Sequence, residues 1–402
     1  MKYLILLGDG MADYKLKELN NKTPLQSART PHMDLLAAKG VIGIASTVPV
    51  GYPPGSDVAN LSVMGYDPAE YYTGRSPLEA VSMGVKLEPD DVAFRCNLVT
   101  LSEEGMYEEK TMVDYSADEV TTAESEELIR QIDKTLATDD MKFYAGFRFR
   151  HLMVWKGGPI GCKLTPPHDI SGRSIAEYLP QDEGGATLLK LMKESYNILS
   201  GHPVNIKRID QGLNPANSVW FWGQGKKPSL TSFYEKYGLR GSVISAVDLI
   251  KGIGISAGLD IVDVENVTGT VETNFKGKVA AALDELAKGQ DFVYLHVEAP
   301  DAASHRGETA TKIKAIEMVD VMLGLLLEGL PLFGDYKVMV LPDHPTPLST
   351  MTHTDKPVPL VIYTSGQDNK NVNGVYDEEA AGKSSLVFPA GYRLMDYFIR
   401  GR

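Results

Sequence analysis

Acidic and histidine side chains follow three separate apolar runs of this 402-residue sequence. The runs read "YLILLG", "FVYLHV" and "YKVMVL", and short apolar runs of this kind are typical of buried parallel strands. The side chains that follow them are Asp9, Asp301, His305, Asp343, His344 and His353. Because ligands bind beyond the carboxyl ends of such strands, we expect these six side chains to meet at one edge of a sheet.

The spacing within this set predicts a site for two divalent metal ions. Asp301 and His305 are four residues apart, so on a helical turn they would share one face and could hold one ion. Asp343 and His344 are neighbours, which would point apart in extended or loop backbone and could serve two ions. A mixture of carboxylates and imidazoles suits Mn²⁺ or Zn²⁺ better than Mg²⁺. We take Mn²⁺ as the first candidate and keep Zn²⁺ and Mg²⁺ as alternatives.

Ser56, in the stretch "PPGSDVANLSV", could be either a helix cap or a nucleophile. Ser and Thr are common at helix N-caps, where the side-chain oxygen accepts a backbone hydrogen bond. Two metal ions about 4 Å apart, however, clamp a phosphoryl group between its attacking and leaving oxygens. A metal-bound serine at a helix N-terminus would also have backbone N–H groups directed at a phosphate. The combined pattern favours Ser56 as the nucleophile of a phosphoryl transfer.

Strands and helices that alternate along the chain must position these residues. The stretch 311–330 predicts a helix, because Ile316, Val319 and Leu323 recur at helical spacing between two of the apolar runs. A further run, "VPLVIY" at 358–363, predicts another strand. This alternation indicates an α/β fold with a parallel sheet covered by helices on both faces.

The middle of the chain has a different character, with acidic helical stretches and connections rich in proline and glycine. We read residues 77–237 as a smaller α+β domain inserted into the sheet domain, which would then be discontinuous and comprise residues 1–76 and 238–402.

Composition narrows the classes of partner. With 53 acidic against 40 basic residues the net charge is -13, which argues against nucleic-acid and anionic-membrane partners. The two cysteines, Cys96 and Cys162, are too few for a disulfide framework, so a reducing cytoplasm is expected. The first residues suggest a buried strand and not a signal peptide, and no apolar run is long enough to span a membrane. The oligomeric state stays open.

Several motifs resemble those of the archaeal-type cofactor-independent phosphoglycerate mutases, within the alkaline phosphatase superfamily. They are "LLGDGMAD", "PPGSDVANLSVMGYDP", "FRCNLVTL", "PPHDISG", "LHVEAPDAASH", "LPDHPTP" and "MTHTDKPVPLVIY". The resemblance implies an alkaline-phosphatase-like metal domain, a glycolytic isomerase activity and a phosphorylated Ser56. It also implies the ligands of the two ions, with Asp9, Ser56, Asp343 and His344 around one and Asp301, His305 and His353 around the other.

The same resemblance gives the inserted domain a role in binding a small phosphorylated substrate and shielding the phosphoserine from water. The positions that match the substrate side of the family are Arg95, Asn97, Asp114, Arg150, His168 and Asp169. Arginine suits carboxylate and phosphate groups because its planar guanidinium makes paired hydrogen bonds.

Two positions depart from the family pattern and keep other functions open. Tyr115 and Trp222 stand where the family has arginine. The main hypothesis is interconversion of 3-phosphoglycerate and 2-phosphoglycerate through a phosphoserine, without bisphosphoglycerate. The first alternative is a phosphotransferase that acts on a small alcohol, like the homoserine kinase proposed for a bacterial branch of the family. A phosphatase or phosphodiesterase and a non-catalytic phosphate-binding protein are the remaining alternatives.

Overall fold

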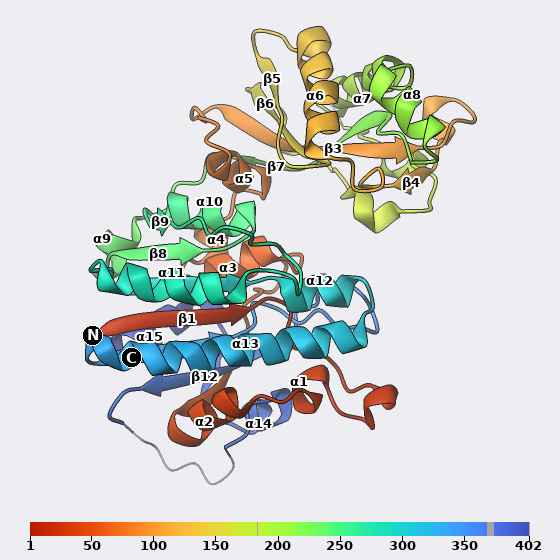
Figure 1. Cartoon of the computed structure of the whole chain (residues 1–402). Helices are drawn as coiled ribbons and strands as arrows, with labels where there is room; N and C mark the ends of the chain where they lie inside the picture. The colour runs from red at the N-terminus through yellow and green to blue at the C-terminus, as the bar shows by residue number, and fades with distance from the viewer. Residues whose placement is uncertain (183, 368–373, 402) are drawn as a thin grey trace. The chain divides into compact units, whose positions relative to one another are not determined.

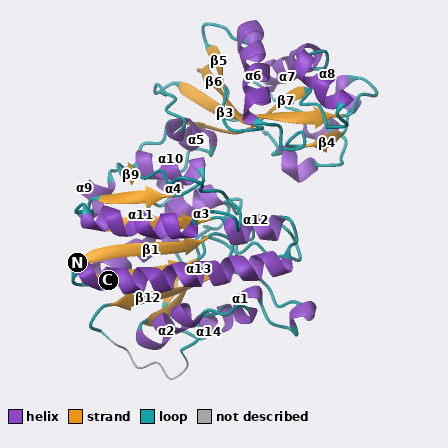
Figure 2. Ribbon diagram, viewed as in Figure 1, coloured by secondary structure: helices purple, strands orange, loops and turns teal. Residues whose placement is uncertain are grey.

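The computed structural model describes residues 1–182, 184–367 and 374–401, which form two compact units. Unit 1 comprises Met1–Tyr72 and Ser229–Arg402, and unit 2 comprises Thr73–Pro228. The chain therefore leaves unit 1, builds unit 2 and returns (Figure 1). Figure 2 distinguishes the helices and strands of each unit.

A single eight-stranded sheet organises unit 1. Its strands lie in the order β13 (Val387–Phe388), β2 (Val41–Ala45), β12 (Val358–Thr364), β11 (Tyr336–Leu341), β1 (Lys2–Gly8), β10 (Phe292–Val297), β8 (Gly241–Ile244) and β9 (Asp260–Ile261). The five strands from β11 to β9 are parallel. The central neighbours β11, β1 and β10 are the three apolar runs that precede the acidic residues, so the sequence prediction of these strands is confirmed.

Strand β12 departs from the expected parallel sheet. It pairs antiparallel with β11 and with β2. No helix lies between Leu341 and Val358, so the chain has no crossover element to carry it back to the start of the sheet. Parallel neighbours need such a crossover, whereas a loop suffices for an antiparallel return. The sheet is therefore mixed, although the fold is α/β as predicted.

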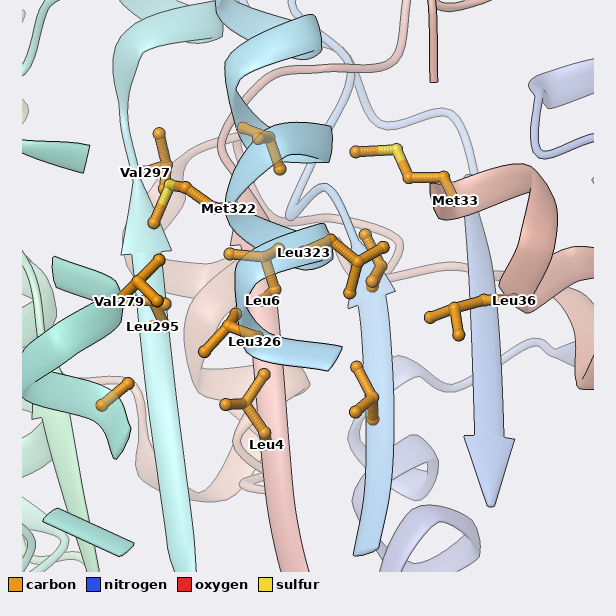
Figure 3. Close-up of a cluster of buried hydrophobic side chains, with 14 of the residues drawn as sticks. Leu4, Leu6, Met33, Leu36, Val279, Leu295, Val297, Met322, Leu323 and Leu326 are labelled. Carbon is orange, nitrogen blue, oxygen red and sulfur yellow. The ribbon is translucent and has the colours of Figure 1, made fainter. Parts of the chain in front are cut away.

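Helices cover both faces of this sheet. They are α1 (Pro24–Ser27), α2 (Pro31–Lys39), α3 (Ser56–Val63), α4 (Pro68–Tyr71), α9 (Phe233–Tyr237), α10 (Asp248–Ser256), α11 (Phe275–Ala287), α12 (Ala299–His305), α13 (Thr309–Gly329), α14 (Glu378–Gly382) and α15 (Leu394–Arg400). Figure 3 shows Leu4 and Leu6 of β1 beside Leu323 and Leu326 of α13, and these side chains belong to one buried cluster. The alternate residues of β1 are equally buried, which confirms that the strand is covered on both sides.

Helix α13 confirms the helix predicted over 311–330, and with 21 residues it is the longest of the described helices. Its apolar residues pack onto the sheet, but Lys312 and Asp320 are buried with them. Neither α13 nor any other helix in the described ranges has the length and apolar content that a membrane crossing requires.

Unit 2 is an α+β body around the long strand β3 (Asp91–Leu101). Its five-stranded sheet also contains β4 (Met112–Asp114), β5 (Met141–Tyr144), β6 (Arg150–Lys156) and β7 (Ser218–Lys226). Its helices are α5 (Ser76–Ser82), α6 (Thr122–Leu136), α7 (Gly185–Leu199) and α8 (Pro203–Asp210). All neighbouring strands are antiparallel, and residues of β3, α6 and α7 share one hydrophobic core.

Candidate active site

Three buried aspartates stand beyond the carboxyl ends of the three central strands of unit 1. Asp9 follows β1, Asp301 lies in α12 just after β10, and Asp343 follows β11. Each has a histidine nitrogen within 4 Å of a carboxylate oxygen. The predicted convergence at one edge of the sheet is thus present in the structure.

One group of candidate ligand atoms lies around Asp301. Asp301 Oδ2 lies 3.2 Å from His305 Nε2, as expected for residues one turn apart on α12. Asp301 Oδ1 lies 3.4 Å from His353 Nε2, and the two histidine Nε2 atoms are 2.9 Å apart. His305 Nδ1 lies 2.9 Å from the backbone oxygen of Met351. The candidate ligand atoms of these three side chains therefore lie within 3.4 Å of one another in pairs.

The second group centres on Ser56. Ser56 Oγ lies 3.0 Å from His344 Nε2. The same nitrogen lies 3.4 Å from Asp343 Oδ2 and 3.8 Å from Asp9 Oδ1. The four residues that the family resemblance assigns to one ion are consequently near neighbours.

His344 borders both groups. Its ring centroid lies 4.0 Å from that of His353. Among the described residues, two sets of three have candidate ligand atoms all within 4.8 Å of one another, namely Asp301, His344 and His353, and Asp9, His296 and Asp343. The structure thus also brings in His296, which the sequence reading did not include.

Ser56 is not a helix cap. Gly55 is the N-cap of α3, Ser56 is the first helical residue, and no side chain caps this terminus. The Ser56 hydroxyl contacts His344 Nε2 instead of a backbone N–H of the first turn. The capping interpretation was wrong, and the first turn of α3 brings its positive dipole end next to Ser56.

Thr346 fixes the imidazole of His344. Thr346 Oγ1 donates a hydrogen bond to Asp301 Oδ1 at 2.6 Å, so its oxygen is left to accept from His344 Nδ1 at 3.2 Å. The Nε2 atom of His344 therefore carries a lone pair and faces Ser56 Oγ. The threonine stands in the motif "PDHPTP", but no sequence rule singled it out.

Asn60 ties Asp343 to the helix that carries Ser56. Asn60 Nδ2 donates to Asp343 Oδ2 and to the Ser56 backbone oxygen, each at 2.8 Å. Tyr294 of β10 donates to Asn60 Oδ1 at 2.6 Å, which fixes the orientation of the amide. Asn60 is one turn after Ser56 on α3, a spacing that could have identified it in the sequence.

A buried ion pair connects the loop after β1 with the loop after β11. Lys312 Nζ of α13 lies 2.8 Å from Asp13 Oδ2 and donates to the Thr346 backbone oxygen at 2.9 Å. Asp13 Oδ2 also accepts the N–H of Leu348 at 3.1 Å. The loop after β1 and the loop after β11 are thereby fastened to each other and to α13.

The electrostatics of the site call for positive charge. Burial, together with the charges of Asp343 and Asp301, raises the pKa of Asp9 well above its ordinary value. Burial also lowers the pKa of His344 to about 4, so this imidazole does not supply a cation at neutral pH. The buried atom Asp9 Oδ1 has no hydrogen-bond partner. Carboxylates with an open oxygen and imidazoles with a free lone pair are a donor set that fits divalent metal ions.

The pKa values of Asp301 and His305 are shifted in the opposite directions to those of Asp9 and His344. Burial works against ionisation of Asp301, but His353 and His305 outweigh it and lower the pKa of the carboxyl. Burial likewise works against a charged His305, yet its hydrogen bond to Asp301 raises the pKa of the imidazole to about 9. This carboxylate is therefore ionised at neutral pH.

In unit 2, Arg95 and Asn97 lie on β3 and are buried. Arg95 pairs with Glu79, which also accepts a hydrogen bond from Arg75 at 3.0 Å. Arg95 Nε donates to Asn97 Oδ1 at 3.2 Å, and the indole N–H of Trp222 donates to the same oxygen at 3.1 Å. Both guanidinium groups lie within 6 Å of the Trp222 ring. The predicted substrate residues Arg95 and Asn97 are thus held inside a paired network.

The other predicted substrate residues lie nearer the surface of unit 2. The His168 ring lies 5.3 Å from the Trp222 ring, and its Nε2 lies 3.8 Å from Asp169 Oδ1. Arg150, at the start of β6, is exposed and lies over Phe149. His168 is therefore brought together with Arg95 and Asn97 around the tryptophan.

Asp114, on β4, holds a turn. Burial works against its ionisation, but hydrogen bonds from the backbone N–H groups of Asp118 and Ser116 outweigh this and lower its pKa. The Ser116 hydroxyl donates to the same carboxylate at 2.8 Å. These contacts occupy Asp114 with local structure.

Comparison with known proteins decides the family. A chain from Geobacter sulfurreducens called a probable 2,3-bisphosphoglycerate-independent phosphoglycerate mutase is 54% identical over 402 residues, 99% of this chain and 100% of the relative. The chain belongs to the 2,3-bisphosphoglycerate-independent phosphoglycerate mutase family. A mutase of this family from Methanosarcina mazei is 50% identical and covers both chains fully.

Family models and solved structures agree with this membership. The model of the 2,3-bisphosphoglycerate-independent phosphoglycerate mutases matches residues 37–205, and that of the type I phosphodiesterases and nucleotide pyrophosphatases matches residues 180–370. A Pyrococcus horikoshii protein superposes with a TM-score of 0.81 at 31% identity, over 99% of this chain and 96% of its own. The cofactor-independent phosphoglycerate mutase of Thermoplasma acidophilum gives 0.62 at 28% identity, over 100% and 99% of the chains. The resemblance inferred from the motifs is confirmed.

Proposed function

We propose that this chain interconverts 3-phosphoglycerate and 2-phosphoglycerate through phosphorylated Ser56, without bisphosphoglycerate. The observation that carries the proposal is the 3.0 Å contact between Ser56 Oγ and His344 Nε2, a nitrogen that also lies near the buried carboxylates of Asp343 and Asp9. Family membership implies dependence on divalent metal ions, and the open Asp9 Oδ1 fits that dependence. We take Mn²⁺ as the ion, with Mg²⁺ and Zn²⁺ as alternatives, and the low cysteine content supports a cytoplasmic setting.

The proposed ligands follow the two groups of side chains. Asp9, Ser56, Asp343 and His344 would hold one ion, and Asp301, His305 and His353 the other. Bound there, the ions would neutralise charge on the phosphoryl oxygens and ease ionisation of the serine hydroxyl. The residues Thr346 and Asn60 keep His344 and Asp343 directed at Ser56.

The reaction is two successive phosphoryl transfers. Ser56 Oγ loses its proton and bonds to phosphorus, while the bond from phosphorus to the glycerate oxygen breaks and that oxygen gains a proton. The other hydroxyl of the glycerate then loses its proton, attacks the phosphoserine and releases Ser56 Oγ, which is protonated again. The first-turn N–H groups of α3 favour the phosphoryl oxygens during both steps.

We assign binding of the glycerate to unit 2. Arg75 and Arg95 both pair with Glu79 and lie at the Trp222 ring, and arginine is the side chain that suits carboxylate and phosphate groups best. The proposed substrate-side residues are Arg95, Asn97, Asp114, Arg150, His168 and Asp169. Because Arg95 and Asn97 are buried and paired, we expect them to act by shaping the surface that His168 and Arg150 present.

An enolase-coupled assay with Mn²⁺ and no bisphosphoglycerate tests this function. Ser56→Ala should lower the rate by at least about 10³-fold, because the nucleophile is removed. Ser200→Ala, which changes an exposed serine in unit 2, is the matched control and should keep the parent rate. Activity of Ser56→Ala equal to that of the parent would refute the phosphoserine. Release of inorganic phosphate faster than 2-phosphoglycerate would instead indicate a phosphatase.

A second candidate is a phosphotransferase on a small alcohol such as homoserine. The observation that favours it is Trp222, an aromatic side chain that lies over Arg75 and Arg95 where the family pattern has a cation. An acceptor screen that offers the Mn²⁺-loaded protein 3-phosphoglycerate, or homoserine with a phosphoryl donor, separates the two functions. Phosphohomoserine formation that exceeds mutase turnover would favour the second.

A further inference from the structure

A chain of buried hydrogen bonds reaches Asp9 at Oδ2, whereas His344 lies near the other carboxylate oxygen, Oδ1. His296, the fifth residue of β10, lies with its Nε2 3.0 Å from Asp9 Oδ2. Its Nδ1 lies 3.2 Å from Ser245 Oγ, in the loop after β8. Ser245 Oγ in turn accepts the backbone N–H of Val247 at 3.0 Å. Because β8, β10 and β1 are adjacent strands, this chain crosses three strand ends to the carboxylate.

The pattern of donors fixes the protonation of His296. Ser245 Oγ accepts from Val247, and within the described ranges His296 Nδ1 is the one contact of Ser245 Oγ that could accept its hydroxyl proton. The Nδ1 atom therefore carries the lone pair, and Nε2 carries the proton. That N–H donates to Asp9 Oδ2, which leaves Asp9 Oδ1 as the oxygen without a partner.

We infer that His296, held by Ser245, is a positioning residue that turns Asp9 Oδ1 toward the metal ion. The inference rests on the metal-dependent function proposed above. A histidine buried completely between two polar partners does not rotate freely, so it fixes which oxygen of Asp9 faces the site. The backbone oxygen of His296 also accepts from buried Lys278 Nζ at 2.8 Å, which anchors the strand end that carries the ring.

The competing role for His296 is that of a direct ligand, since its nitrogen belongs to a compact set with Asp9 and Asp343. A ligating Nε2 must give up its proton. The proton would then sit on Nδ1 and point at Ser245 Oγ, whose own hydroxyl proton would lose its acceptor. The hydrogen bonds around Ser245 thus favour positioning over ligation.

The contribution of His296 to metal affinity is measured by titrating the metal-free full-length protein with Mn²⁺. Electron paramagnetic resonance detects the free Mn²⁺ at each step. His296→Leu should weaken one of the two binding steps about 10- to 100-fold, the usual effect of removing a group that orients a ligand. His296→Gln, which can still offer an N–H to Asp9, should lose less. Ser245→Ala should weaken the same step a few-fold. His151→Gln is the matched control, because His151 is also fully buried but lies in unit 2, and its Mn²⁺ affinities should equal the parent's.

The protonation of the ring separates the two roles. The parent protein is labelled with ¹⁵N-histidine and compared in its metal-free and Zn²⁺-loaded states. Long-range ¹H–¹⁵N spectra should show His296 with a protonated Nε2 in both states. The peak is assigned by its loss in His296→Gln. A ring that loses the Nε2 proton on metal loading is a ligand, and that result would overturn the inference.

Unchanged Mn²⁺ affinities in both His296→Gln and Ser245→Ala would also overturn it, even if His296→Leu failed to fold. None of these readouts needs a substrate. Failure of the mutase assay with normal metal binding would therefore count against the proposed function alone, whereas an indifferent His296 would count against this inference alone.

Discussion

The two units of this protein solve the problem of buried charge in different ways. In unit 1, Asp9, Asp301 and Asp343 are buried together, and none of the ion pairs among the described residues joins them to a lysine or arginine. In unit 2, the buried Glu79 is paired directly with Arg95 and Arg75. Buried charges are costly unless they are paired.

The aspartates of unit 1 thus depend on added cations for charge balance. In unit 2, the arginines of the chain balance the charge of Glu79. The contrast also exists within unit 1, where Lys312 balances Asp13 only a few residues from Asp9. The fold can therefore place a lysine beside a buried aspartate in this region. Among the described residues no lysine or arginine pairs with Asp9, and this, beside an open Asp9 Oδ1, supports the proposal that the carboxylates are metal ligands.

The largest effect is expected when the completed network is broken. Arg95→Leu leaves Glu79 buried with one cation fewer, which should lower the free energy of unfolding by about 3–5 kcal/mol. Urea unfolding followed by tryptophan fluorescence measures it. The double variant Arg95→Leu with Glu79→Leu should recover most of the loss, because the two buried charges are removed together and Arg75, which also loses its bond to Glu79, is partly exposed to water. A loss below about 1 kcal/mol in the single variant would mean that unit 2 does not depend on this pair.

The buried carboxylates that have no lysine or arginine partner should respond in the opposite direction. Asp9→Asn removes one like charge and keeps an acceptor for His296, so the metal-free protein should gain about 1 kcal/mol of stability. At 100 times the dissociation constant, an ion adds about 2.7 kcal/mol to the parent, and the variant should lose this gain for one site. Thermal unfolding with and without Mn²⁺ checks both parts, with the exposed Asp210→Asn as control. A destabilised metal-free Asp9→Asn would contradict the comparison.

The frame of the site was predictable from the sequence. Apolar runs followed by Asp9, Asp301 and Asp343 identified three strands that prove to be adjacent, and the four-residue spacing of Asp301 and His305 placed both on one turn of α12. Hydrophobic periodicity and the polar residues that end an apolar run are local properties, so they can be read directly from the sequence. The roles of these residues as ligands stay predictions.

What the sequence could not supply depends on contacts between distant segments. His296 looked like an ordinary member of an apolar strand, and only its neighbours Asp9 and Ser245 give it a task. The direction of β12 depended on a missing crossover helix, which periodicity within the strand cannot reveal. Ser56 was one residue away from the N-cap, and helix boundaries are uncertain by more than that from sequence alone.

Glu378 shows a third way to bury an acidic side chain, because it stays protonated and therefore neutral. It accepts hydrogen bonds from Thr23 Oγ1 at 2.8 Å and from the Asp13 N–H at 3.1 Å. Burial is the main cause that raises its pKa from 4.5 to about 7. Between these values the folded state keeps a proton that the unfolded state has released, so the stability of the parent falls as the pH rises through this window.

Glu378→Gln, which has no proton to lose, should therefore gain stability relative to the parent as the pH rises from 5 to 8. We expect a change on the order of 2 kcal/mol, less than the full linkage value because the amide satisfies Thr23 and Asp13 imperfectly. Urea unfolding of both proteins without metal at each pH measures it, and taking the difference removes the titration of the other acids that they share. A difference that is constant over this range would show that Glu378 is ionised in the folded protein, balanced by the nearby Lys312 as Asp13 is.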